Sequence, residues 1–326
     1  MTDEFPLPVL VAFGLSSATP KLLEGGRMNR HWLVGSPSGQ LVIRRSNLTR
    51  TAPAVLWEHA LVRFAGSRQW PVALPLPTSN GSTVFEHDGA VWSVAPFLEG
   101  DPGREDSPAL RTIYGRLLAR LHRDLQSFPE AEQRPGIGKT WELDIMVEPA
   151  GAGSFNALLA AFAREHPELA ANIRRQRYRN LRELSRLHYP DLPDRPIHGD
   201  FQPWNLLFRE GQLSGVLDFD QCRRDALACD IAPLLVPFQP LDIRLATAFL
   251  RGYESVLPLS DAEWELLPAL IRAALLWWLA HLLVRWRLDG GDATAIARTI
   301  NHRFPALDAA EPAFRAIRAG SQPRSG

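Results

Sequence analysis

The chain has 326 residues, which is enough for roughly two or three domains and for a large apolar core. Its 36 lysine and arginine residues balance its 36 aspartate and glutamate residues, so the net charge offers no attraction to nucleic acid or to an anionic membrane. We therefore expect neither of these as a partner.

The two cysteines, Cys222 and Cys229, are too few for a structural zinc site, which needs about four Cys or His ligands in close spacing. We expect both to be reduced thiols. The first residues lack the basic region and apolar core of a signal peptide, and the longest apolar run, residues 273–284, is shorter than the ~20 residues of a membrane span. These features favour a cytoplasmic protein.

The first hundred residues predict short strands around one helix. Residues 31–34 and 41–45 are strand-like runs separated by a turn-forming cluster, and residues 83–85 and 90–95 alternate like two more strands. Residues 54–64 place apolar side chains among helix formers and predict an amphipathic helix.

The pattern breaks at residues 96–100, and the spacing of apolar residues beyond them is helical. Helices are predicted around residues 113–121, 155–162, 174–187, 245–257 and 264–286. Residues 174–187 also carry a run of arginines: Arg174, Arg175, Arg177, Arg179, Arg182 and Arg186. A charge run of this kind favours a solvated helix face over a substrate or polyanion site.

Acidic and amide side chains recur at a spacing typical of phosphoryl transfer. Asp200 precedes Asn205 by the interval with which kinase catalytic loops place a hydroxyl-orienting carboxylate beside a magnesium ligand. Residues 206–208 and 213–217 are apolar runs joined by a turn, so they predict a hairpin that returns Asp218 to the side of Asn205. Because Mg²⁺ prefers oxygen ligands, Asn205 and Asp218 would supply half of its shell and the phosphates of ATP the rest.

A simpler interpretation of these residues is chance. The motif arises by accident in on the order of one chain in a hundred of this length. Asp200 would then be a turn residue, and Asp218 and Asp220 would be solvated ends of a strand. The occurrence of a catalytic loop, an apolar hairpin and a second acidic cluster in the right order favours the catalytic interpretation.

The region from residue 197 to residue 232 resembles the aminoglycoside phosphotransferase and choline kinase family of small-molecule kinases. The resemblance lies in the loop from His198 to Asn205, in segment 216–220, which is similar to the metal-binding strand of the family, and in the acidic segment 225–232. It implies an α+β, two-lobed, protein-kinase-like fold. A small antiparallel-sheet lobe, residues 1–97, would bind the nucleotide, and a larger, mostly helical lobe, residues 98–326, would carry catalysis and the substrate.

The resemblance also implies an activity and its cofactors. The protein would use ATP and Mg²⁺ to move the γ-phosphoryl group to a small-molecule hydroxyl acceptor, and we expect it to be a monomer or a homodimer. Nucleotide contacts are implied at Gly25, Gly26 and Asn29 in a covering loop, and at the backbone of Ser93, Ala95 and Phe97, which would read adenine.

Arg44 stands where the family usually carries the lysine that grips the nucleotide phosphates. Arginine keeps the charge and offers a planar fork of donors, but it differs from lysine in reach and geometry. Arg45 would point to the opposite face of the strand, so we expect Arg44 to be the residue that faces the nucleotide. Glu58, on the predicted helix, is the candidate partner of Arg44.

The remaining roles follow from positions in the motif. Asp200 would accept or orient the proton of the acceptor, and His198 would brace the catalytic loop. Asp220, one alternation beyond Asp218 on the predicted strand, would be a second metal-side or supporting carboxylate. For Asp230, outside the motif, the resemblance implies a buried anchor of the loop. For His122 we expect a hydrogen-bonded packing residue and not a catalyst.

The arginines of the sequence bear on the chemical class of the acceptor. The arginine-rich helix, with Arg223 and Arg224 after the metal segment, disfavours a strongly cationic acceptor such as an aminoglycoside. It favours a carboxylate or neutral hydroxyls, and segment 218–225 is similar to type II homoserine kinases. The alternative function is a nucleotide-binding pseudokinase or regulatory module without turnover, which the intact Asp200 opposes and the departure at Arg44 slightly favours.

Overall fold

The computed structural model describes residues 5–24, 29–47, 50–104, 107–235, 242–290 and 293–321. The chain forms two compact units that interleave along the sequence. The first consists of Met1–Gly103, Ser127–Ile137 and Gln202–Cys222, and the second of Arg104–Gln126, Gly138–Phe201 and Arg223–Gly326. The division into lobes at residue 97 stays a prediction.

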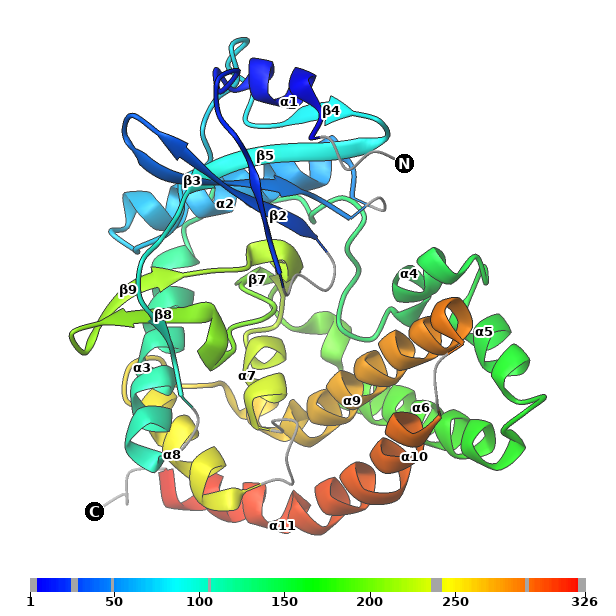
Figure 1. Cartoon of the computed structure of the whole chain (residues 1–326). Coiled ribbons are helices and arrows are strands. Elements are labelled where there is room, and N and C mark those ends of the chain that lie inside the picture. The colour runs from blue at the N-terminus through cyan, green and yellow to red at the C-terminus, as the bar shows by residue number, and fades with distance from the viewer. Residues whose placement is uncertain are drawn as a thin grey trace. The chain divides into compact units, whose positions relative to one another are not determined.

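The first unit contains a five-stranded antiparallel sheet in the order β1-β2-β3-β5-β4 (Figure 1). Its strands are β1 (Lys21–Leu23), β2 (Arg30–Ser36), β3 (Gly39–Arg45), β4 (Phe85–His87) and β5 (Ala90–Pro96). The predicted strands are present, although β4 begins at Phe85 and not at residue 83. In the pairing of β3 with β5, Arg44 lies opposite Ser93.

Two helices cover the two faces of this sheet. From helix α1 (Leu7–Ala12), Val9 packs with Trp92 and Val94 of β5 in one apolar cluster. Val91 points to the other face because side chains alternate along a strand, and it packs with Val55 of helix α2 (Ala52–Ser67). The oxygen of the Thr51 side chain accepts from the backbone N–H of Ala54 and caps the start of α2.

A second, three-stranded sheet of the first unit has the order β6-β8-β9. Its strands are β6 (Asp101–Pro102), β8 (Leu206–Arg209) and β9 (Gln212–Val216), and the short 3-10 helix η3 (Pro203–Asn205) precedes β8. The predicted hairpin is confirmed by the antiparallel pairing of Leu206 with Val216. The predicted continuation of its second strand to Asp220 is wrong, because β9 ends at Val216 and η4 (Phe219–Gln221) is a 3-10 turn.

The second unit is mostly helical (Figure 1). Its helices are α3 (Pro108–Leu125), α4 (Leu143–Val147), α5 (Phe155–Phe162), α6 (Pro167–Arg186), α7 (Ala228–Leu235), α8 (Ile243–Glu254), α9 (Asp261–Asp289), α10 (Thr294–Arg298) and α11 (Phe304–Ser321). The short 3-10 helices η1 (Glu148–Ala150) and η2 (Tyr189–Asp191) and the π-helix η5 (Thr299–Arg303) connect some of them. Strand β7 (Arg195–Ile197) pairs antiparallel with β10 (Arg223–Asp225). The predicted helices and the α+β class are confirmed.

Helices α3 and α8 cross with their backbones in close approach. A Cβ atom on Gly115 would lie 2.1 Å from the carbonyl oxygen of Phe249, and one on Gly252 would lie 2.2 Å from that of Thr112. Real Cβ atoms do not approach backbone this closely, so both positions require glycine. The crossing brings the ring of His122 within hydrogen-bond distance of the Tyr253 hydroxyl.

Helix α9 is long and apolar enough, by length and composition, to cross a membrane. However, 67% of its most apolar window is buried inside the structure. Side chains such as Leu266, Leu270 and Leu279 are fully buried. This burial is what a core helix of the second unit shows, and the apolar composition follows from it.

Candidate active site

In the first unit, Arg44 lies between two carboxylates. Its Nη1 atom donates to Oε1 of Glu58 at 2.6 Å and to Oδ1 of Asp220 at 2.8 Å. Arg45, on the other face of β3, lies over the ring of Trp92 at 5.8 Å. The expected Arg44–Glu58 pair is therefore present, and strand alternation explains why Arg44 and not Arg45 makes it.

Two of the three guanidinium nitrogen atoms of Arg44 donate no hydrogen bond within the described residues. Its Nε and Nη2 atoms are buried and have no hydrogen-bond partner among the residues that the structure describes. Burial by itself would lower the pKa of Arg44, but the carboxylates of Glu58 and Asp220 raise it above its ordinary value. Burial would likewise raise the pKa of Glu58, yet Arg44 and Arg134 hold it below its ordinary value. The site thus presents a permanent cation with two unpaired donors, which suits a bound anion.

Asp220 is turned toward this cluster. Its Oδ2 atom accepts from the side-chain amide of Asn29, and its backbone carbonyl accepts from Arg50 at 2.9 Å. Both carboxylate oxygens of Asp220 therefore accept hydrogen bonds from the protein, which favours its supporting alternative over the metal-side one. The argument from strand alternation is wrong, because Asp218 has a left-handed backbone with φ 59° and a 3-10 turn follows it.

Among the residues predicted to contact the nucleotide, Asn29 is buried beside Asp220, and Gly25 and Gly26 lie outside the described residues. Ser93 and Ala95 lie within β5. Phe97 follows that strand, and its N–H donates to the carbonyl of Gln40 at 2.9 Å. The adenine-reading role of this segment stays a prediction.

Asn205 and Asp218 are brought together by the hairpin. The N–H of Leu217 donates to the carbonyl of Asn205 at 2.8 Å, so Asp218 directly follows the residue bonded to Asn205. In the described part of the chain, no group of three or more His, Cys, Asp or Glu side chains could hold a metal ion. An amide and a carboxylate oxygen fit Mg²⁺, which usually takes only one or two carboxylates and completes its shell with water and phosphates. Their role as metal ligands stays a prediction.

Sequence reasoning missed Arg134, which lies at the centre of the same cluster. Its Nη2 atom donates to Oε2 of Glu58 at 2.7 Å, and its Nη1 atom donates to the carbonyls of Asp220 at 2.9 Å and Cys222 at 3.1 Å. Cys222 and Cys229 are free, as expected; both are also buried, and burial raises the pKa of Cys222 to about 12. Arg134 follows a polar stretch before a proline and a glycine, and nothing local distinguishes it from a surface residue.

In the second unit, Asp230 holds the start of the predicted catalytic loop. Its carboxylate accepts from the backbone N–H groups of His198 and Gly199, each at 2.6 Å, and lies 3.0 Å from Nε2 of His122. Gly199 has φ 84°, a conformation that favours glycine. Nδ1 of His198 accepts from the N–H of Asp200 at 3.2 Å. The expectations for Asp230 as a buried anchor and for His122 as a packing residue are confirmed.

The charge state of this network follows from burial and hydrogen bonds. Burial would raise the pKa of Asp230, but hydrogen bonds from His122 and the backbone lower it, so the carboxylate is ionised. Burial raises the pKa of Tyr253 well above its ordinary value, so its hydroxyl is protonated, and it forms a hydrogen bond of 2.7 Å with Nδ1 of His122. Because an ionised carboxylate can only accept, His122 donates its Nε2–H to Asp230.

The arginines from which the charge of the acceptor was inferred are either ion-paired or exposed in the second unit. Arg223 is buried, its Nε donates to Asp225 at 3.1 Å and its Nη2 to the Thr140 hydroxyl at 2.6 Å. Its charge is thus balanced by Asp225, which weakens the inference that Arg223 repels cationic acceptors. On α6, the predicted solvated face is present at four exposed residues: Arg174, Arg175, Arg182 and Arg186.

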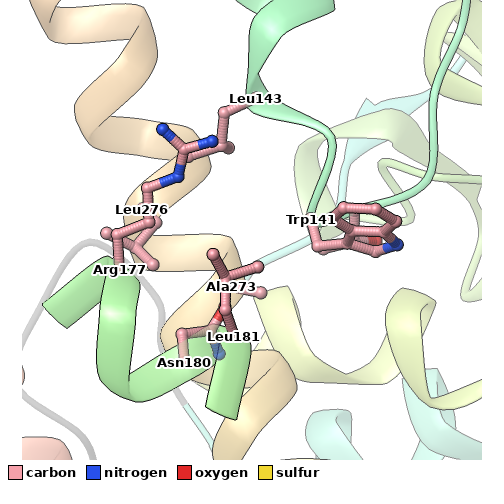
Figure 2. A pocket seen from close by; sticks show the side chains of 8 residues that line it. Trp141, Leu143, Arg177, Asn180, Leu181, Ala273 and Leu276 are labelled. Carbon is pink, nitrogen blue, oxygen red and sulfur yellow. The ribbon is translucent and has the colours of Figure 1, made fainter. Parts of the chain in front are cut away.

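Arg177, also on α6, borders a small hollow against α9 (Figure 2). The hollow is lined by Thr140, Trp141, Leu143, Arg177, Asn180, Leu181, Ala273 and Leu276. The Arg177 guanidinium lies 4.8 Å from the ring of Phe155 and donates to Oδ1 of Asn156 at 2.8 Å. The hollow has no room for the centre of a water molecule, so we assign no acceptor to it.

Comparison with known proteins agrees with the class that the motif predicts, a small-molecule phosphotransferase. Residues 19–270 match the phosphotransferase enzyme family, and the chain therefore belongs to that family. It is 32% identical over 235 residues to the homoserine kinase of Rhizobium johnstonii, covering 69% of this chain and 68% of that protein. It is 27% identical over 276 residues to the homoserine kinase of Gluconobacter oxydans, covering 82% and 83%.

Solved structures show the same fold. The amicoumacin kinase in complex with AMP-PNP, Ca²⁺ and amicoumacin superposes with a TM-score of 0.68 at 16% identity, covering 89% of this chain and 88% of that one. The microcompartment-associated aminopropanol kinase gives a TM-score of 0.65 at 19% identity, covering 93% and 94%. The predicted protein-kinase-like fold and the enzyme class, a phosphotransferase with an alcohol group as acceptor, are confirmed.

Proposed function

We propose that this phosphotransferase uses ATP and Mg²⁺ to transfer a γ-phosphoryl group to a hydroxyl group of a small metabolite. The observation that carries the nucleotide part is the pair of buried, unpartnered donors on Arg44, held between Glu58 and Asp220. A planar guanidinium fork matches phosphate oxygens. The amicoumacin kinase of the same fold was solved with AMP-PNP and Ca²⁺, which supports a nucleotide and a divalent cation here.

Each residue of this proposal has one task. Arg44 binds phosphate oxygens, and Asn205 and Asp218 hold the metal ion. Mg²⁺, when bound, would neutralise charge on the phosphates. Asp200 accepts or orients the proton of the acceptor hydroxyl, which aligns its oxygen for attack on phosphorus. His198 accepts from the Asp200 N–H and so restrains the backbone that carries this carboxylate.

For the acceptor we propose homoserine, or another small metabolite with a carboxylate or neutral hydroxyls, ahead of aminoglycosides. Homoserine kinases from several bacteria are 25–32% identical to this chain, and the match to the Gluconobacter protein extends over 82% of it. The exposed arginines of α6 add positive surface to the second unit, which does not favour a polycationic acceptor. In this proposal the enzyme acts in the cytoplasm, as a monomer or a homodimer.

A panel of acceptors tests the proposal. The purified protein is incubated with ATP and Mg²⁺ and, in parallel reactions, with homoserine, other hydroxy amino acids, amino alcohols, simple sugars and aminoglycosides. Phosphorylated products are identified by mass spectrometry, because loss of ATP alone does not identify an acceptor. We expect a product with homoserine or a related metabolite.

Phosphorylation of aminoglycosides without homoserine or sugars would reverse the order of acceptors while leaving the reaction type intact. Binding of ATP without any product across the panel would support the non-catalytic alternative. EDTA, followed by Mg²⁺ or Ca²⁺ readdition, establishes which divalent ion supports product formation.

A further inference from the structure

We propose that Arg134 is a positioning residue that fixes the geometry of Arg44 through both of its carboxylate partners. The proposal rests on the proposed function, since it concerns the cation that binds the nucleotide phosphates. Arg134 belongs to the segment Ser127–Ile137, which is part of the first unit although residues 104–126 before it belong to the second. Its side chain is 1% exposed.

The first route from Arg134 to Arg44 passes through Glu58. The two oxygens of Glu58 are divided between the two arginines, Oε1 with Arg44 at 2.6 Å and Oε2 with Arg134 at 2.7 Å. A carboxylate held at both oxygens cannot rotate without breaking one charge-assisted hydrogen bond. Arg134 therefore fixes the orientation in which Glu58 meets Arg44.

The second route passes through the turn that carries Asp220. Nη1 of Arg134 donates to the carbonyls of Phe219 at 3.2 Å, Asp220 at 2.9 Å and Cys222 at 3.1 Å. These bonds hold the backbone from which the Asp220 side chain reaches Arg44. Nε of Arg134 donates to the carbonyl of Ala54 at 2.8 Å, which ties the first turn of α2 to the same guanidinium.

Only a guanidinium can make this set of contacts. Its planar fork of five N–H donors reaches acceptors on three sides, whereas a lysine ammonium has three donors at one point. Arg44, Arg50 and Arg134 gather around Glu58 and Asp220 in this cluster, and the carboxylate of Asp218 also acts on Arg44. What favours an anion at this site is the pair of buried Arg44 donor atoms, Nε and Nη2, that have no partner among the described residues.

The test compares Arg134→Lys with Arg111→Lys as a matched control. Arg111 is equally buried at 1% exposure, but it lies in the second unit and donates to the carbonyl of Leu234. Both variants lose a buried guanidinium and some stability. We expect only Arg134→Lys to raise the Kd and KM for ATP, by ~10- to 100-fold, because displacing a binding group by about an ångström has effects of this size. The KM for the acceptor should stay unchanged.

If Arg134→Lys does not fold, Arg134→Ala purified with methylguanidinium supplies the missing fork as a separate molecule. If the affinity for ATP rises with the methylguanidinium concentration, the proposal is supported. If the affinity does not change with that concentration, the proposal is overturned. Thermal unfolding measured on each sample establishes that the assays are made on folded protein.

The outcomes separate this proposal from the proposed function. If the wild-type protein makes product and Arg134→Lys affects ATP no more than Arg111→Lys does, the positioning role is wrong and the kinase assignment stands. If the wild-type protein neither binds ATP nor makes product, both proposals are wrong. A selective loss of ATP affinity in an active enzyme supports both.

Discussion

Two irregular segments of this protein are held by single buried charges of opposite sign. In the first unit, the cation of Arg134 donates to three carbonyls of segment 219–222. In the second unit, the anion of Asp230 accepts from two backbone N–H groups at His198 and Gly199. The sign of each anchor follows from the backbone groups that face it, since carbonyls need a donor and N–H groups need an acceptor.

The charges of the two anchors, Asp230 and Arg134, are compensated by different kinds of groups. Asp230 accepts from two backbone N–H groups and lies within hydrogen-bond distance of His122, and this network holds the loop. The charge of Arg134 is balanced by the carboxylate of Glu58, which also forms an ion pair with Arg44. Among the described residues, the cluster around the cationic anchor thus ends in unpaired donors, and the network around the anionic anchor does not. An anchor can therefore be purely structural or extend into a proposed binding site, depending on how its charge is compensated.

The largest expected effect is on kcat, and it comes from Asp200, on the loop that Asp230 holds. Asp200→Asn should lower kcat by ~10²- to 10⁴-fold, the range for loss of a general base, because the amide cannot accept the acceptor proton. The backbone bond from residue 200 to His198 remains, so ATP affinity and the unfolding midpoint should be unchanged. Asp191→Asn, whose side chain is 77% exposed, is the control. A kcat near the wild-type value would remove Asp200 from its assigned role.

Removal of the second anchor should cost stability as well as activity. In Asp230→Ala, two buried N–H groups and His122 lose their acceptor, and we expect the unfolding free energy to fall by ~3 to 5 kcal/mol, as for other broken buried charge networks. Urea unfolding at pH 7 measures the change, with Asp191→Ala as control. A loss below about 1 kcal/mol would mean that the loop does not depend on this carboxylate.

The positive field of the first unit can be tested through His59. Its pKa is lowered from 6.5 to about 3 by burial and then by Arg44, Arg63 and Arg134. Below pH 6.5 the unfolded chain protonates His59 and the folded protein does not, so stability falls as the pH drops from about 6.5 toward about 3. Between pH 8 and pH 5 this group should account for about 2 kcal/mol of lost unfolding free energy.

His59→Gln should remove that share of the acid sensitivity, because glutamine has no such titration and can still bond to Thr83. His188→Gln, at a side chain that is 80% exposed, should leave it in place. The measurement is urea unfolding at several pH values. Identical pH profiles for wild type and His59→Gln would contradict the effect of burial and the nearby arginines on this histidine.

The smallest expected effect is on the unfolding free energy, and it comes from Tyr253, which is linked to Asp230 through His122. Tyr253→Phe removes the hydroxyl that is hydrogen-bonded to Nδ1 of His122 at 2.7 Å, and we expect a loss of about 1 kcal/mol in unfolding free energy. Tyr178→Phe, at a side chain that is 66% exposed, serves as control. Equal stability of the two variants would show that the network ends at His122.

Much of the fold was predictable because its signals are local. Apolar residues at helical spacing marked α3, α5 and α9, and the alternating runs around a turn marked the hairpin of β8 and β9. The motif from His198 to Asn205 indicated the class of enzyme, and the resemblance it carries pointed to Arg44 and Glu58. In each case the residues that decide the prediction are neighbours in the sequence or occupy fixed places in a motif.

The sequence by itself therefore determined the class of enzyme, the helices and the residues of the loop. Tertiary structure alone decided that Arg134 joins Glu58, from which it is 76 residues away, and that Asp220 faces Arg44. It also decided that Arg223 is balanced by Asp225. The physical reason is that periodicity reports which side of an element is apolar, whereas the partner of a buried charge depends on how distant segments pack and on turns such as the left-handed one at Asp218.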